Sequence, residues 1–183
     1  MSTGMGSVQK TALILPGRRY SVDRPVLYYV ARVARDLGWR MEVVDWGSTD
    51  VSVESVIARG RNALSSLPPQ DAVVIGKSLG SLLLPDVVEM GLPAIWLTPL
   101  LNREELRVAV SRKSAPTLLV GGSRDDLWDS QLAHATGHAV LELEGGDHSL
   151  ELPGDAFGSA RFLVALAQCA HDFLAGLEQR GAR

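Results

Sequence analysis

The regular alternation of short apolar runs with helix-length segments constrains the fold of this chain most strongly. Segments with helix start and stop signals separate the runs; residues 23–38 are the clearest, with Asp23 as N-cap, Pro25 in the first turn and Gly38 at the end. The apolar runs are typical of strands buried on both faces of a sheet. These runs are rich in Val, Ile and Leu and lie at residues 11–15, 41–46, 72–75, 93–97, 117–120 and 139–143.

Strands and helices that alternate in this way predict one α/β domain. Because crossover connections between parallel strands are right-handed, we expect a mainly parallel six-stranded sheet with helices on both faces. The length of 183 residues is sufficient for one domain with a sizeable core. We expect residues 11–183 to form this domain and the polar residues 1–10 to form a disordered tail.

Composition and charge disfavour two classes of partner. The formal net charge of −3 gives no electrostatic reason to expect a nucleic acid or an anionic membrane. No apolar segment is long enough to span a bilayer, and the first ten residues lack the apolar core of a signal peptide, so we expect a cytoplasmic protein. The single cysteine, Cys169, excludes an internal disulfide and a cysteine-based zinc site.

The segment DAVVIGKSLGS, residues 71–81, places a serine between two glycines directly after the third apolar run. A strand-to-helix turn at Ser78 needs glycine on both sides, because backbone comes close to backbone there. Such a turn would strain Ser78, raise its hydroxyl above the sheet and put the amide of Leu79 at a helix N-terminus. Two other interpretations are a serine that caps a helix and a phosphate-binding loop, which would have Asp71 where that motif requires glycine.

Two further predicted strand ends supply a base and an acid for Ser78. A serine hydroxyl needs a base to remove its proton, and the base needs an acceptor that fixes its tautomer. Among four histidines, only His148 follows a predicted strand in a glycine-rich loop, at the edge where Ser78 should emerge. Asp125 and Asp126 follow the fifth strand, and one of them is placed to reach His148, with Asp147 as a weaker alternative.

The segments LILPGRRY, VVIGKSLGS, LLVGGSRDDLWD and LEGGDHSLE resemble the α/β-hydrolase superfamily, specifically its small, lidless, dienelactone-hydrolase-like members. The resemblance covers nearly the whole chain and implies a minimal form of that fold without a cap domain. It implies that Ser78 is the nucleophile, His148 the general base and acid, and Asp125 the orienting carboxylate. Dienelactone hydrolases themselves use a cysteine nucleophile, so the serine argues against that activity.

The resemblance also implies oxyanion donors and a class of substrate. The donors would be the amides of Leu79 and Arg18, with Gly17 and Tyr20 beside the substrate. The expected activity is that of a serine hydrolase on a small ester, thioester or lactone, with a small-molecule acyl substrate, no cofactor and no metal. A lyase or cyclase on the same scaffold and a non-catalytic binding module stay open as alternatives.

Four side chains near the predicted rim have two interpretations each. Arg18 and Arg19 either bind a carboxylate or phosphate of the substrate or are simply solvated. Trp46 and Trp128 either form the floor of an acyl pocket or are half-buried packing residues.

Overall fold

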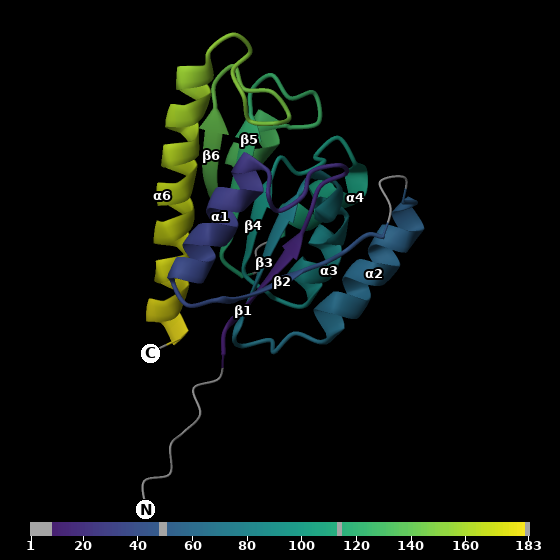
Figure 1. Ribbon diagram of the computed structural model, residues 1–183. Helices are drawn as coiled ribbons and strands as arrows, with labels where there is room; N and C mark the ends of the chain where they lie inside the picture. Colours follow the sequence, from purple (N-terminus) through teal and green to yellow (C-terminus); the bar gives the residue numbers. More distant parts are fainter. Residues whose placement is uncertain (1–8, 48–50, 113–114, 182–183) are drawn as a thin grey trace, which may run out of the picture.

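The computed structural model describes residues 9–47, 51–112 and 115–181 and has three layers, with a sheet between two layers of helices (Figure 1). The sheet has six strands in the order β2-β1-β3-β4-β5-β6, and every neighbouring pair is parallel. The predicted fold class is therefore confirmed. The strands are β1 (Thr11–Leu15), β2 (Arg40–Val43), β3 (Ala72–Lys77), β4 (Ala94–Leu97), β5 (Thr117–Gly122) and β6 (Ala139–Leu143).

The helices divide between the two faces of the sheet. One face is covered by α1 (Pro25–Asp36) and α6 (Ala156–Gly181), which pack against each other (Figure 1). The other face is covered by α2 (Val53–Ser65), the 3₁₀ helix η1 (Ser78–Leu83), α3 (Leu84–Glu89), α4 (Glu104–Val110) and α5 (Ser130–Ala135).

Side chains of each central strand alternate between two hydrophobic cores, because successive residues of a strand point to opposite faces. In β1, Ala12 and Ile14 pack toward α1 and α6, whereas Leu13 and Leu15 pack toward α2 and η1. The prediction of strands buried on both faces holds for β1, β3, β4 and β5. It is wrong for β2 and β6, whose residues are partly exposed because these strands form the edges of the sheet.

The predicted ends of α1 are half right. The N-cap is Arg24 and not Asp23, and no side chain caps the helix there. Pro25 fits the first helical position because it has no N–H to satisfy and its φ is already helical, so the cap falls on the residue directly before it. At the other end Gly38, with φ +83°, donates its N–H to the Arg35 carbonyl at 2.9 Å and closes the helix as expected.

The ordered domain begins before the boundary expected at residue 11. The Lys10 carbonyl accepts the Arg40 N–H at 2.8 Å, and the Lys10 ammonium pairs with Glu178 and lies 5.1 Å from the centre of the Trp39 ring. Residues 1–8 of the predicted tail lie outside the described residues. In the described part of the chain, no helix has both the length and the apolar character that crossing a membrane requires.

The order of the strands creates a crevice beside β3. The chain passes from β1 to β2 at the edge and then returns across β1 to β3, so the connections after β1 and β3 leave on opposite faces, as α1 and η1. Open parallel sheets bind ligands at such a reversal, beyond the carboxyl ends of the strands. The link from β4 to α4 is six residues, 98–103, so no cap domain is inserted there.

Gly80→Ala should destabilise the protein by about 3 kcal/mol or more. A Cβ at residue 80 would lie 2.1 Å from the carbonyl oxygen of Leu15, and a buried central strand cannot move away. Gly176→Ala is the matched control: a Cβ there meets nothing within 4 Å, and alanine favours a helix by up to about 1 kcal/mol over glycine. Urea unfolding of the three proteins measures both changes, and equal midpoints for Gly80→Ala and wild type would contradict the expectation.

Candidate active site

Ser78 lies at the sharp turn where β3 ends and η1 begins. Its φ is +48°, in the left-handed region that residues with a side chain rarely adopt. The glycine requirement is met by two different contacts. At Gly80 a Cβ would strike the backbone of Leu15, as expected, whereas at Gly76 it would lie 2.2 Å from the Trp96 ring, so a side chain and not backbone excludes it.

The structure brings Ser78, His148 and Asp125 together from three loops. Ser78 Oγ is 2.8 Å from His148 Nε2, and His148 Nδ1 is 2.7 Å from Asp125 Oδ2. Both hydrogen bonds lie within the range of good geometry. The interpretation of Ser78 as a simple helix cap is therefore wrong, because its hydroxyl bonds the histidine and the N-cap of η1 is Lys77.

Burial and hydrogen bonds distinguish Asp125 from the two alternative acids, Asp126 and Asp147. The Asp125 side chain is 1% exposed and its second oxygen accepts the Leu127 N–H at 3.0 Å, so the carboxylate is fixed in orientation. Asp126 is exposed. Asp147 instead accepts the N–H groups of Ser149 and Glu151 and shapes the loop that carries His148.

Ser81 links the turn at Ser78 to the loop after β4 through hydrogen bonds. Its hydroxyl is fully buried, donates to the Ser78 carbonyl at 2.6 Å and accepts the Leu100 N–H at 3.0 Å. The hydrogen bonds show that serine fixes the position of the loop after β4.

Residues with strained backbone cluster beyond the carboxyl ends of the strands. In the described part of the chain, the non-glycine residues with positive φ are Arg19, Ser78, Thr98 and Leu150, and they follow β1, β3, β4 and β6 respectively. Such conformations cost free energy and persist where surrounding packing holds them, which is common at functional sites. The strain therefore marks the same edge as the Ser78–His148–Asp125 hydrogen bonds.

Lys77, the last residue of β3, is an unexpected member of the site. Its side chain is 1% exposed, and its ammonium donates to Thr98 Oγ1 at 2.5 Å and to the His148 carbonyl at 2.8 Å. The same ammonium lies 4.8 Å from the centre of the Tyr20 ring. Lys77 thus points into the protein beneath the loop of His148, which contradicts the phosphate-loop interpretation of GKS.

Burial lowers the pKa of Lys77 to about 8, and the charges of Asp125 and Asp147 oppose the shift only in part. Tyr20 is half-buried beside it, and burial raises the pKa of its phenol. The Tyr20 hydroxyl accepts the Val26 N–H at 3.3 Å. Tyr20, expected beside the substrate, therefore also serves as the aromatic wall that faces the buried ammonium.

The predicted oxyanion donors come from the segments that follow β1 and β3. Leu79 is in the first turn of η1, where amides have no partner within the helix. Arg18 is at the tip of a turn in which Gly17 and Tyr20 pair, with the Tyr20 N–H 3.3 Å from the Gly17 carbonyl oxygen. Their roles as oxyanion donors stay predictions.

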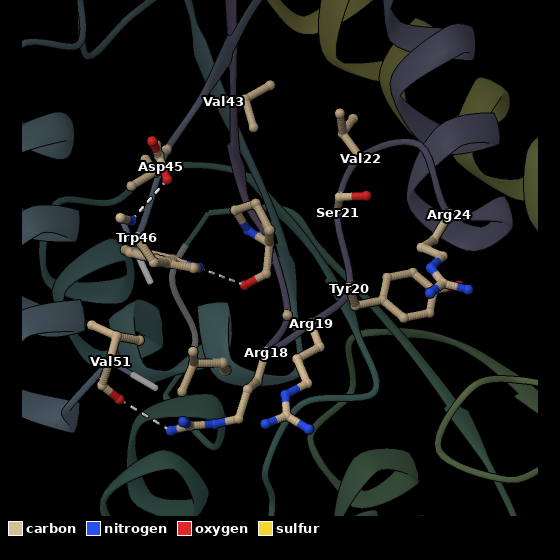
Figure 2. Close-up of a pocket in the computed structure, with 15 residues that line it drawn as sticks. Arg18, Arg19, Tyr20, Ser21, Val22, Arg24, Val43, Asp45, Trp46 and Val51 are labelled. Carbon is tan, nitrogen blue, oxygen red and sulfur yellow. Dashed lines mark hydrogen bonds between the residues drawn. The ribbon is translucent and has the colours of Figure 1, made fainter. Parts of the chain in front are cut away.

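A cavity of about 750 Å³ adjoins the turn at Leu79, between the loops after β1 and β2 (Figure 2). Trp46 forms part of its wall and donates its Nε1–H to the Pro16 carbonyl at 3.1 Å. Trp128 does not line it and instead packs on Gly121 and donates to Glu142 at 2.7 Å. In the residues that the structure describes, no group of three His, Cys, Asp or Glu side chains could hold a metal ion.

Comparison with known proteins gives similarity of structure alone. No family model matches the sequence, and no curated protein is significantly similar to it. Est1E from Butyrivibrio proteoclasticus superposes with a TM-score of 0.69 at 14% identity, over 98% of this chain and 92% of that one. A serine hydrolase without lid from Xanthomonas campestris gives 0.60 at 18% identity, over 92% and 83%.

An esterase domain from Rhodothermus marinus gives a TM-score of 0.61 at 17% identity, over 92% of this chain and 90% of that one. Together these similarities show that the chain has the α/β-hydrolase fold in its lidless form. The fold expected from the four sequence segments is confirmed.

Lys77→Met should change how stability depends on pH. The folded pKa of Lys77 is about 8, below the ordinary value of 10.5, so between these values the unfolded chain binds more protons. Wild-type stability should therefore gain roughly 3 kcal/mol from this residue as the pH rises from about 8 to 10.5. Denaturant unfolding of wild type and Lys77→Met across this range measures the difference.

The quantity to compare is the difference in unfolding free energy between wild type and Lys77→Met at each pH, because other groups titrate in both proteins. Arg35→Met is the matched control, because it removes a cationic side chain from an exposed residue in the last turn of α1, and a guanidinium stays charged throughout this pH range. Its curve should run parallel to that of wild type. Parallel curves for Lys77→Met and wild type would contradict the lowered pKa of Lys77.

Proposed function

We propose that this protein is a cytoplasmic serine hydrolase that cleaves a small ester, thioester or lactone through an acyl-enzyme. The observation that carries the proposal is the unbroken hydrogen-bond path from the Ser78 hydroxyl through His148 to the buried carboxylate of Asp125. The strained turn that presents Ser78 and the shared fold with proteins described as a serine hydrolase and an esterase domain support it.

The hydrogen-bond partners assign a role to each ring nitrogen of His148. The Asp125 carboxylate can only accept, so Nδ1 carries the proton and donates to it. In the neutral ring Nε2 is then the acceptor of the Ser78 hydroxyl proton. His148 can therefore remove the Ser78 proton during attack on the carbonyl carbon and return it to the leaving group.

The developing oxyanion would be bound by the amides of Leu79 and Arg18. Backbone donors fixed before the reaction need no reorganisation as charge forms on the carbonyl oxygen, which is why such groups lower the barrier. After the leaving group departs, water activated by His148 attacks the acyl-enzyme and regenerates the Ser78 hydroxyl. Lys77 supports this cycle by holding the backbone of His148 through its carbonyl.

A fluorophosphonate probe should form a covalent adduct on Ser78. We expect labelling of wild type, no adduct on Ser78→Ala, and little on His148→Ala because the base that activates the serine is missing. Hydrolysis of p-nitrophenyl acetate and butyrate should fall by about 10³-fold or more in both variants. Mass spectrometry locates the adduct, and circular dichroism checks that the variants fold. A folded wild type with neither adduct nor turnover would favour a binding module instead.

Asp125→Asn should lower kcat by roughly 10³- to 10⁴-fold, because an amide no longer selects the His148 tautomer that accepts from serine. Asp126→Asn is the matched control, since it makes the same chemical change on the adjacent, exposed residue. Steady-state kinetics with p-nitrophenyl butyrate compares the two. Equal losses, or a larger loss in Asp126→Asn, would show that Asp125 is not the orienting acid.

A further inference from the structure

The cavity beside Leu79 combines an apolar floor with a cationic rim. Pro16, Val44, Trp46, Val51 and Leu79 supply apolar surface around a volume of about 750 Å³. Three arginines from one short loop, Arg18, Arg19 and Arg24, also line it (Figure 2). A substrate group that fits such a cavity has an apolar chain and an anionic end.

The chemistry of the leaving group decides which part of the substrate enters this cavity. The leaving group takes its proton from His148, so it must lie on the side of Ser78 where His148 stands, after β6. The cavity lies on the opposite side, over the carboxyl ends of β1 and β2. The acyl chain of the tetrahedral intermediate therefore points into the cavity.

The charges at the rim favour an anion. Arg19 sits at the tip of the turn after β1 with φ +53°, and its side chain is exposed to the cavity mouth. Arg18 reaches toward Val51 in Figure 2 and donates to the Val51 carbonyl at 3.2 Å, which holds the loop after β2 against the turn. Among the described residues that line the cavity, the one carboxylate is Asp45, which accepts the Gly47 N–H at 2.7 Å. The described residues of the lining carry a net positive charge, although the net charge of the whole chain is −3.

We propose that this cavity binds the acyl group of the substrate and that the acyl group ends in a carboxylate, which Arg19 binds at the rim. The substrate is then a monoester or monothioester of a dicarboxylic acid. This inference rests on the proposed hydrolase function and names its substrate class. A guanidinium suits this task because it can donate two parallel hydrogen bonds to a carboxylate.

Two test esters with acyl chains of equal length isolate the effect of a terminal carboxylate on kcat/KM. They are 4-nitrophenyl hydrogen adipate and 4-nitrophenyl hexanoate. In each, the bond from Ser78 Oγ to the carbonyl carbon forms as the bond to 4-nitrophenolate breaks, and water then releases adipate or hexanoate. We expect kcat/KM for the adipate ester to be about tenfold or more above that for hexanoate, after subtraction of the uncatalysed rate.

The ratio of the two kcat/KM values should depend on the rim arginines. Arg19→Gln should lower the ratio about tenfold, and Arg24→Gln should lower it less. Arg35→Gln is the matched control, because it removes the same charge from an exposed residue in the last turn of α1, outside the cavity, and should leave the ratio unchanged. A ratio near one in wild type, or a ratio insensitive to Arg19→Gln, would overturn the carboxylate site while the hydrolase function stands.

Failure of the hydrolase function is distinguishable from failure of this site. A folded protein that releases nitrophenolate from neither ester contradicts the hydrolase function. The site is then tested by saturation-transfer NMR with Ser78→Ala and two probes, monomethyl adipate and methyl hexanoate. Stronger transfer to monomethyl adipate, lost when Arg19→Gln is added, supports the carboxylate site, and equal transfer to both probes overturns it.

Discussion

The buried ammonium of Lys77 is the interaction on which the arrangement of the active-site loops depends. The Lys77 side chain extends from the end of β3. Its ammonium contacts Thr98 after β4, His148 after β6 and Tyr20 after β1. A buried charge is tolerated only when hydrogen bonds replace the lost water, so these loops and the ammonium fix one another. Because Ser78 is the next residue, the Ser78 hydroxyl and the His148 backbone are positioned from the same point of the chain.

Close packing sustains the strain that this arrangement requires. A positive φ at Ser78 persists because Gly80 lies against the Leu15 carbonyl and Ser81 bonds both the Ser78 carbonyl and the loop after β4. The strained residues all follow strands of a parallel sheet, whose carboxyl ends meet at one edge. The fold therefore concentrates its costly conformations where the hydrogen-bonded Ser78, His148 and Asp125 lie, and leaves the two cores regular.

The sequence predicted the strands, the sheet and the meeting of Ser78, His148 and Asp125, because apolar period, glycine spacing and strand ends are local signals. It did not predict Lys77, since a lysine beside a glycine and a serine resembles a loop residue, and its burial depends on partners 21 and 71 residues away. A signal existed: Lys77 directly continues a fully buried strand. The contact of Gly76 with Trp96, and the exposure of β2 and β6, likewise depend on strand order, which local pattern does not encode.

A lidless domain must obtain its selectivity from the loops beyond the sheet. Here the link after β4 is short and carries no cap, so we propose that contacts to substrate come from the loops after β1 and β2 beside the turn of Ser78. These loops are held by Arg18 on the Val51 carbonyl and by Trp46 on the Pro16 carbonyl, which join the two walls of the cavity. We propose that these contacts hold Arg19 at a set distance from Ser78, so that the cavity selects an acyl chain by its length as well as by its charge.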